Sequence, residues 1–162
     1  MKYKDDLASW FENKIKIEEK FDSEKTKSFY FKQKEIYYAD LGVNVGYEEN
    51  KIRPVIILSK NVLNKGNVTV APLTSMYRKT PDGGSVRKRI MYGQCYLKAK
   101  NYKNLNKDSI ILLDQMRTIS ISRLRNYSDT SICSSENVKP LFYVNEDDWK
   151  IIKAKLKNIF DM

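Results

Sequence analysis

The hydrophobic positions of this 162-residue chain follow two different periods. Near the N-terminus, apolar residues recur at the spacing of one helix face and predict a helix over residues 5–21. The residues of that face are Leu7, Trp10, Phe11 and Ile15. Asp5 or Asp6 is expected to cap the start of the helix. Because a polar linker over residues 22–28 follows, we expect residues 1–33 to form a helical extension rather than an independent domain.

A second helical pattern occupies the C-terminus and predicts a helix over Glu146–Phe160. Asn145 is the expected N-cap, and the acidic residues that follow it suit the positive end of the helix dipole. The apolar stripe expected to pack on a core consists of Trp149, Ile152, Leu156, Ile159 and Phe160.

Between the helices the pattern changes to short apolar or alternating runs, which are typical of β-strands. Strands are expected over residues 34–40, 55–59, 68–73, 89–98, 109–114 and 115–121. Glycine and asparagine mark a loop over Gly42–Ile52, and the sequence T-P-D-G-G-S marks another over Thr80–Ser85. Several short strands separated by turns favour a small barrel or sandwich, so the predicted class is mainly β with helices at both ends.

The positive charge is concentrated in one part of the chain. The net charge is +10, and residues 76–126 alone hold twelve basic and three acidic side chains, a net of +9. Tyrosines such as Tyr77, Tyr92 and Tyr96 are interleaved with these charges. Cations beside aromatic rings suit single-stranded nucleic acid, because phosphates pair with the cations and unpaired bases stack on the rings. A basic face that only aids solubility is the alternative.

The composition excludes several kinds of enzyme and indicates a compartment. The chain has no histidine, which excludes Ser-His-Asp and Cys-His hydrolases and zinc enzymes of the H-E-x-x-H kind. Its two cysteines, Cys95 and Cys133, form no C-x-x-C motif, and we expect free thiols in a reducing compartment. Neither a signal peptide nor an apolar run of membrane-spanning length is present, so we expect a cytoplasmic protein that does not bind membranes.

Three segments, in order, carry a family resemblance. They are E-I-Y-Y-A-D-L-G-V-N-V-G-Y-E-E-N-K-I-R-P-V over 35–55, V-T-V-A-P-L-T-S over 68–75, and D-S-I-I-L-L-D-Q-M-R-T-I-S-I-S-R-L over 108–124. Together they resemble the MazF/PemK toxins, sequence-selective endoribonucleases of type II toxin–antitoxin systems in the CcdB/MazF superfamily. The resemblance extends over residues 34–162, the expected ribonuclease domain, and does not cover residues 1–33.

The resemblance implies a fold, a reaction and a set of partners. The implied fold is an SH3-like small β-barrel with a C-terminal helix, assembled as a homodimer. The implied reaction is metal-independent cleavage of single-stranded RNA, in which the ribose 2′-OH attacks the adjacent phosphate and leaves a 2′,3′-cyclic phosphate and a 5′-OH. No cofactor is implied, and a cognate antitoxin is the expected protein partner.

Residues that match the family motifs receive their roles from the resemblance. Arg53 would bind the scissile phosphate and stabilise the transition state, since a guanidinium is always charged and grips two phosphate oxygens. Thr74 would hold a phosphate oxygen through its hydroxyl. Glu48 would be the general base for the 2′-OH, with Glu49 as a rival that can equally orient Arg53.

A wider set of residues is expected to bind RNA. It consists of Asn44, Tyr47, Lys51, Ser75, Arg78, Arg87, Lys88, Arg89, Gln115 and Arg117. The first three lie in the loop that lines the RNA groove in the family, and Gln115 and Arg117 have the functional groups to reach base edges or phosphates.

Some features depart from the family pattern and leave other functions open. Lys34 stands where a glycine usually precedes the first strand, and Asn50–Lys51 replace small residues of the loop. A toxin of the CcdB kind, which binds DNA gyrase and has no nuclease activity, is one alternative and would rely on residues 149–162. A catalytically inactive RNA-binding relative is the other.

Overall fold

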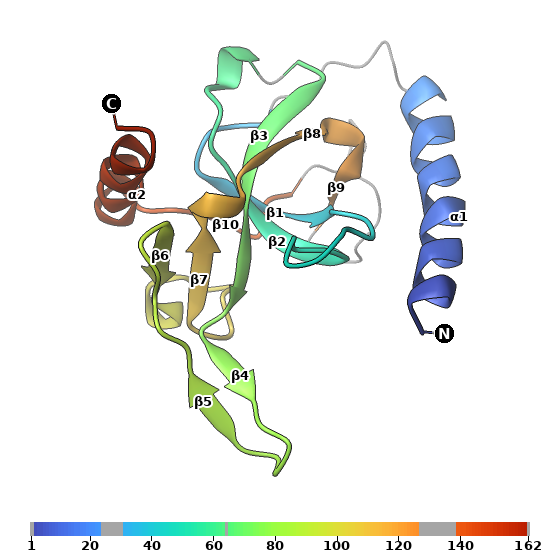
Figure 1. Cartoon of the computed structure of the whole chain (residues 1–162). Helices are drawn as coiled ribbons and strands as arrows, with labels where there is room; N and C mark the ends of the chain where they lie inside the picture. Colours follow the sequence, from blue (N-terminus) through green and yellow to red (C-terminus); the bar gives the residue numbers. More distant parts are fainter. Residues whose placement is uncertain (1, 24–30, 64, 127–138, 162) are drawn as a thin grey trace.

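The computed structural model describes residues 2–23, 31–63, 65–126 and 139–161. Figure 1 shows a bent antiparallel sheet with helix α1 on one side and helix α2 on the other. The strands follow the order β10-β1-β2-β3-β7-β6, while β8 also pairs with β3 and β9 with β1. A separate two-stranded ribbon, β4–β5, projects away from the sheet. Residues 24–28 of the expected linker over 22–28 lie outside the described residues, and Cys133 does as well.

The predicted elements are present with shifted ends. The helices are α1 (Lys2–Ser23) and α2 (Glu146–Ile159). The strands are β1 (Glu35–Asp40), β2 (Ile52–Ile57), β3 (Asn67–Ser75), β4 (Tyr77–Lys79), β5 (Ser85–Arg87), β6 (Gln94–Leu97), β7 (Ser109–Leu112), β8 (Arg117–Ser120), β9 (Leu124–Arg125) and β10 (Phe142–Tyr143). One-turn 3₁₀ helices are η1 (Asn61–Leu63), η2 (Ala99–Asn101), η3 (Leu113–Gln115) and η4 (Ile121–Arg123).

The expected strand over 89–98 is wrong in its first half, because the structure has a strand only at β6. The ribbon β4–β5 was not expected, although its turn coincides with the predicted loop Thr80–Ser85. All six ribbon residues are exposed, so no alternation of buried and exposed positions marks them in the sequence.

Five strands form the small barrel that the sequence predicts. Strands β9, β1, β2, β3 and β8 are successive antiparallel neighbours, and η4 joins β8 to β9. No ladder pairs β8 with β9 among the described residues, so the ring of hydrogen bonds is open at that corner. The interior is filled by Phe31, Tyr37, Ala39, Leu41, Val55, Ile57, Val68, Val70, Ile119, Ile121 and Leu124. Since Phe31 is 1% exposed, the barrel core already begins within residues 1–33.

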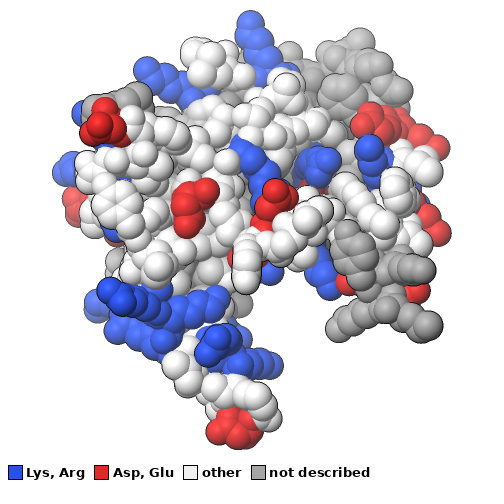
Figure 2. All heavy atoms as spheres, in the orientation of Figure 1, with Lys and Arg blue, Asp and Glu red and all other residues white. Residues whose placement is uncertain are grey.

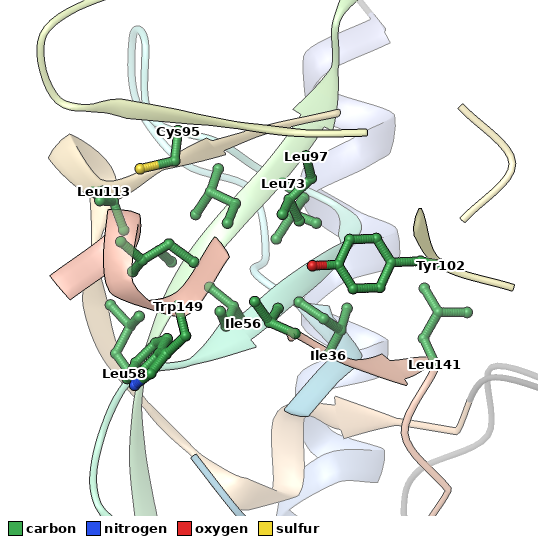
Figure 3. Close-up of a cluster of buried hydrophobic side chains, with 14 residues drawn as sticks. Ile36, Ile56, Leu58, Leu73, Cys95, Leu97, Tyr102, Leu113, Leu141 and Trp149 are labelled. Atoms are coloured by element: carbon green, nitrogen blue, oxygen red, sulfur yellow. The ribbon is translucent and has the colours of Figure 1, made fainter. Parts of the chain in front are cut away.

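The outer face of the same strands is buried as well. Ile36, Ile56, Ala71 and Leu73 alternate with the barrel residues and pack against β6, β7 and α2. Figure 3 shows this second core, to which α2 contributes Trp149 and β6 contributes Cys95. Burial on both faces explains why the central strands are apolar runs rather than alternating sequences.

Helix α2 follows its sequence prediction closely. Asn145 caps it, because the side-chain oxygen of Asn145 accepts a hydrogen bond of 2.8 Å from the backbone N–H of Asp148. Trp149 and Ile152 are buried, whereas Phe160 is 51% exposed and does not extend the packed stripe. Lys34 ties the start of β1 to this helix, since its ammonium lies 2.5 Å from Glu146 and 5.8 Å from the centre of a Trp149 ring.

Two lysines occupy backbone conformations that usually require glycine. Lys34 has a φ of 75° and Lys51 a φ of 63°, in the left-handed region that disfavours a side chain. Lys34 stands where the resemblance leads us to expect glycine, and its left-handed φ is the conformation that a glycine would adopt most readily.

Helix α1 is present, but the predicted apolar face is partly wrong. Phe11 and Ile15 are 56% and 59% exposed, whereas Ile17 is 5% exposed and Trp10 faces the barrel. The helix begins at Lys2, so Asp5 and Asp6 lie inside it rather than at its cap. The residues that face inward, Trp10 and Ile17, are seven positions apart, which also places them on one face of a helix.

Two adjacent isoleucines of α2 test the packing of the second core. Ile152→Ala will lower the free energy of unfolding by about 2–5 kcal/mol, because Ile152 is 1% exposed and its loss leaves a cavity. Ile151→Ala is the control, since Ile151 is 54% exposed and should change stability by about 0.5 kcal/mol or less. Urea denaturation measures both, and equal losses would contradict this packing.

Candidate active site

Arg53 and Thr74 come together where strand β2 leaves strand β3. The ladder between these strands pairs Ile57 with Val70 and ends with Val55 opposite Pro72. Continued two residues beyond the end of the ladder, this register leads to Arg53 on β2 and Thr74 on β3, and both residues line one cavity. Beyond Pro72, β3 keeps β7 as its neighbour on the other side. The edge that β2 vacates opens a cleft.

The cleft has a volume of about 390 Å³, and its lining combines basic and hydroxyl side chains with apolar ones. Its lining consists of Lys51, Ile52, Arg53, Pro54, Leu73, Thr74, Ser75 and Ser109. Four of the residues predicted from the sequence to bind or cleave RNA therefore share one cavity: Arg53, Thr74, Ser75 and Lys51.

The carboxylate that contacts Arg53 belongs to Glu49. Arg53 Nε lies 2.7 Å from Glu49 Oε2 and donates to the Asn50 carbonyl at 2.9 Å. In the part of the chain that the structure describes, both contacts of the guanidinium use Nε, so the two Nη groups are free to face a phosphate. Glu48 is exposed on a turn closed by its own N–H to the Val45 carbonyl. The geometry thus favours the rival, Glu49, over Glu48.

Three side chains hold the backbone of Glu49 in place. The Glu49 N–H donates to Gln115 Oε1 at 2.8 Å, while its carbonyl accepts from Arg117 Nη2 at 2.9 Å and from Asn44 Nδ2 at 2.7 Å. Gln115 also donates to the Tyr47 carbonyl at 3.2 Å. Both hydrogen-bonding groups of the Glu49 backbone are therefore satisfied by side chains, which fixes the point from which its carboxylate reaches Arg53.

In this network the side chains of Asn44, Gln115 and Arg117 form hydrogen bonds within the protein. The sequence predicts that they bind RNA, whereas in the structure each of the three forms a hydrogen bond with the backbone of the loop between β1 and β2. The sequence signal for the network was the D-Q-M-R segment itself, whose partners lie 66 to 68 residues away. Tyr47, in contrast, is 99% exposed and remains available to stack on a base.

Helix α1 packs on the other side of this loop. Asp6 Oδ2 lies 3.3 Å from Lys51 Nζ, and the Arg123 guanidinium lies 5.1 Å from the centre of a Trp10 ring. Gly42 has a φ of +84°, and a Cβ at this position would lie 2.9 Å from the Trp10 ring. Only glycine combines this φ with this close approach, so residues outside the family-like region help to shape the loop.

The basic side chains of residues 78–89 gather at the ribbon β4–β5. Figure 2 shows Lys and Arg clustered where the ribbon leaves the body, with acidic atoms at its tip. Arg78, Arg87, Lys88 and Arg89 line a hollow of about 330 Å³ together with Val86. Of these, Lys88 also reaches the cleft, because its Nζ donates to Thr74 Oγ1 at 3.2 Å. A hydrogen bond between Lys88 of the ribbon hollow and Thr74 of the cleft therefore connects the linings of the two sites.

Tyr96 and Asp108 support the base of the ribbon. Tyr96 donates to Asp108 Oδ2 at 2.5 Å, and the Arg87 guanidinium lies 5.8 Å from the Tyr96 ring centre. The hydrogen bonds from Tyr96 and from the Ala99 N–H lower the pKa of Asp108, while the bond to Asp108 raises the pKa of Tyr96. Asp108 is therefore an anion and Tyr96 a neutral donor near neutral pH.

Two further features of the described residues bear on function. Within them, no group of three or more His, Cys, Asp and Glu side chains is arranged to hold a metal ion. No helix in the same ranges has both the length and the apolar character needed to cross a membrane.

Comparison with known proteins identifies the family. The model of the family described as PemK-like, MazF-like toxins of type II toxin–antitoxin systems matches residues 32–160. The chain is 34% identical over 95 residues to endoribonuclease EndoA of Bacillus subtilis (strain 168), an alignment that covers 57% of this chain and 73% of EndoA.

Solved structures agree in fold. MazF from Deinococcus radiodurans superposes with a TM-score of 0.56 at 17% identity, covering 83% of this chain and 99% of that one. Toxin MazF-mt6 of Mycobacterium tuberculosis gives 0.52 at 22% identity, with coverage of 79% and 97%. An endoribonuclease from a mycobacterial species, solved with its cognate antitoxin, gives 0.53 at 14% identity, with coverage of 82% and 96%. The chain belongs to the PemK/MazF family of toxin–antitoxin endoribonucleases.

Proposed function

We propose that this protein is the toxin of a toxin–antitoxin pair and cleaves single-stranded RNA, mRNA included, without a metal ion, which inhibits growth. In the reaction, the ribose 2′-oxygen forms a bond to phosphorus as the bond to the 5′-oxygen breaks. The products end in a 2′,3′-cyclic phosphate and a 5′-OH. The observation that carries the proposal is that Arg53 and Thr74 line one cleft, with the Glu49 carboxylate in contact with the guanidinium.

Arg53 and Thr74 supply the charge stabilisation. The Nη groups of Arg53 bind the non-bridging oxygens of the scissile phosphate, whose negative charge increases as the fifth bond to phosphorus forms. The Thr74 hydroxyl donates to one of these oxygens, and Ser75, beside it, contacts the same strand of RNA. Fixed donors suit this work because they need no reorganisation at the moment of reaction.

Glu49 is the carboxylate we assign to the reaction, in place of Glu48. In this proposal its 2.7 Å contact with Arg53 Nε orients the guanidinium, and its carboxylate takes the proton of the 2′-OH. Asn44, Gln115 and Arg117 act as positioning residues because they hold the Glu49 backbone.

The remaining cationic and aromatic residues extend the RNA surface away from the cleft. Arg78, Arg87 and Arg89 are exposed on or beside the ribbon β4–β5 and suit successive phosphates, while Tyr47 offers an open ring for a base. Lys51 lines the cleft and is already paired with Asp6, so RNA competes with α1 for its charge.

We propose a cognate antitoxin, a homodimeric assembly and a cytoplasmic location. Solved family members include a toxin with its cognate antitoxin and a MazE–MazF complex, which supports the antitoxin partner. Residues 1–33 serve in this proposal as an extension of the ribonuclease domain 34–162. A gyrase-binding function is less suited to this chain, because Trp149 and Ile152 of α2 are buried in the core.

Arg53→Ala tests the proposed reaction. The wild-type protein, incubated with a long single-stranded RNA in EDTA, will give discrete fragments ending in cyclic phosphate. Arg53→Ala will lower the rate by about 100- to 1000-fold, because it removes a preorganised cation from the transition state. The variant Lys157→Ala, on an exposed position of α2, is the control. No cleavage by the wild type, together with inhibited supercoiling by gyrase, would overturn the proposal.

A pair of adjacent glutamates tests the assignment of the carboxylate. Glu49→Gln will lower kcat by about 100-fold or more, because the amide can neither take the 2′-OH proton nor direct Arg53 as an anion. Glu48→Gln, a change of the same size on the exposed turn, will alter kcat by about threefold or less. Single-turnover cleavage measures both rates. The reverse order of effects would return the role to Glu48.

The ribbon arginines are tested by the salt dependence of binding. Replacing Arg78, Arg87 and Arg89 with Gln will flatten the slope of log affinity against log salt by about 2, since each lost phosphate contact removes roughly 0.7 for a single strand. A 2′-O-methylated RNA, which cannot be cleaved, is the probe. The control variant replaces three exposed lysines of α2, namely Lys150, Lys153 and Lys157. Equal slopes for all three proteins would show that the ribbon does not touch phosphate.

A further inference from the structure

One ribbon cation differs from its neighbours in where it points. Lys88 is half-buried, whereas Arg78, Lys79, Arg87 and Arg89 are exposed. Its ammonium donates to Thr74 Oγ1 at 3.2 Å, and Thr74 lines the cleft that also holds Arg53. Its chain neighbours Arg87 and Arg89 are exposed and line the ribbon hollow together with Lys88, so the contact with Thr74 is what distinguishes Lys88.

The backbone of Lys88 is anchored to the strand that carries Thr74. The Lys88 N–H donates to the Met76 carbonyl at 2.8 Å, and the Met76 N–H donates to the Asp108 carbonyl at 2.9 Å. Met76 is 1% exposed and packs with Ile110 and other residues in a small core below the ribbon. The backbone of Lys88 is therefore held beside Met76, which lies two residues after Thr74 in the chain. Only the Lys88 side chain remains to be ordered.

The contact restricts what the Thr74 hydroxyl can do. A hydroxyl carries one hydrogen and two lone pairs, whereas an ammonium has hydrogens alone. When Lys88 occupies a lone pair of Thr74 Oγ1, the hydroxyl cannot donate to Lys88, and its own hydrogen is free for another acceptor. The anionic phosphate in the cleft is the strongest acceptor available there, and a charged donor on the same oxygen polarises the O–H bond further.

We infer that Lys88 is a positioning residue for RNA cleavage: it orients the Thr74 hydroxyl toward the scissile phosphate. The inference rests on the proposed ribonuclease function. Lys88 forms no bond in the reaction. The 2′-oxygen–phosphorus bond forms, the phosphorus–5′-oxygen bond breaks, the 2′-OH proton goes to Glu49, and the 5′-oxygen takes a proton from solvent.

A double-mutant cycle with Thr74 tests the inference. Lys88→Met will lower single-turnover kcat by about 10- to 100-fold, with little change in KM, because the oriented donor acts on the transition state. In a Thr74→Val background the same change will cost less than about threefold, since the hydroxyl through which Lys88 acts is gone. Lys88→Arg, which keeps a charged donor, will retain more of the activity than Lys88→Met.

Lys79→Met is the matched control, because it removes one lysine charge from the same ribbon at an exposed position and should leave kcat unchanged. Urea denaturation confirms the folding of each variant, and Lys88→Gln replaces Lys88→Met in the cycle if the latter unfolds. Losses that multiply in the double mutant, or a rise in KM alone, would show that Lys88 only contacts RNA. An inactive wild type would defeat the proposed function itself, whereas an active wild type with multiplying losses defeats only the role of Lys88.

Discussion

Strand β3 is the constraint on which the rest of this structure depends. Its nine residues pair in turn with β8, β2 and β7, so one strand belongs to the barrel at its start and to the second layer at its end. Both faces are buried over most of its length, which requires a continuous apolar run. Where β2 departs, the strand edge becomes accessible, and the polar residues Thr74 and Ser75 stand there. The cleft is thus a consequence of how the two cores share a strand.

The site on that edge is built around the positive charge of Arg53, which the negative charge of Glu49 neutralises. Arg53 is a permanent cation, and Glu49 offsets it at 2.7 Å in the free protein. The loop that carries Glu49 has no regular structure of its own and depends on side chains from η3, β8 and the loop itself to satisfy its backbone. Such a loop is held by a few hydrogen bonds rather than by a core, so modest free energies control the geometry of the guanidinium.

The absence of histidine sets the kind of chemistry that this arrangement can perform. Arginine and lysine remain charged throughout the neutral range, so they stabilise phosphate charge without taking part in proton transfer. In the proposed reaction the substrate supplies its own nucleophile, and the protein has to provide only one proton acceptor. The cleft offers the Arg53 guanidinium with Glu49 in contact and the Thr74 hydroxyl with Lys88 in contact, and the ribbon extends the positive surface outward.

The sequence by itself determined most of the elements and the family, and it singled out Arg53 and Thr74 as candidates, because periodicity and short motifs are local and can be recognised without coordinates. The Asn145 cap and the packed residues of α2 were also predictable from local sequence. Tertiary structure alone decided which side chains meet: Glu49 rather than Glu48 contacts Arg53, Gln115 and Arg117 hold a distant loop, and Lys88 of the R-K-R run contacts Thr74. Adjacent residues of similar chemistry look alike in a sequence, and only the direction of the backbone, fixed by contacts more than a dozen residues away, distinguishes them.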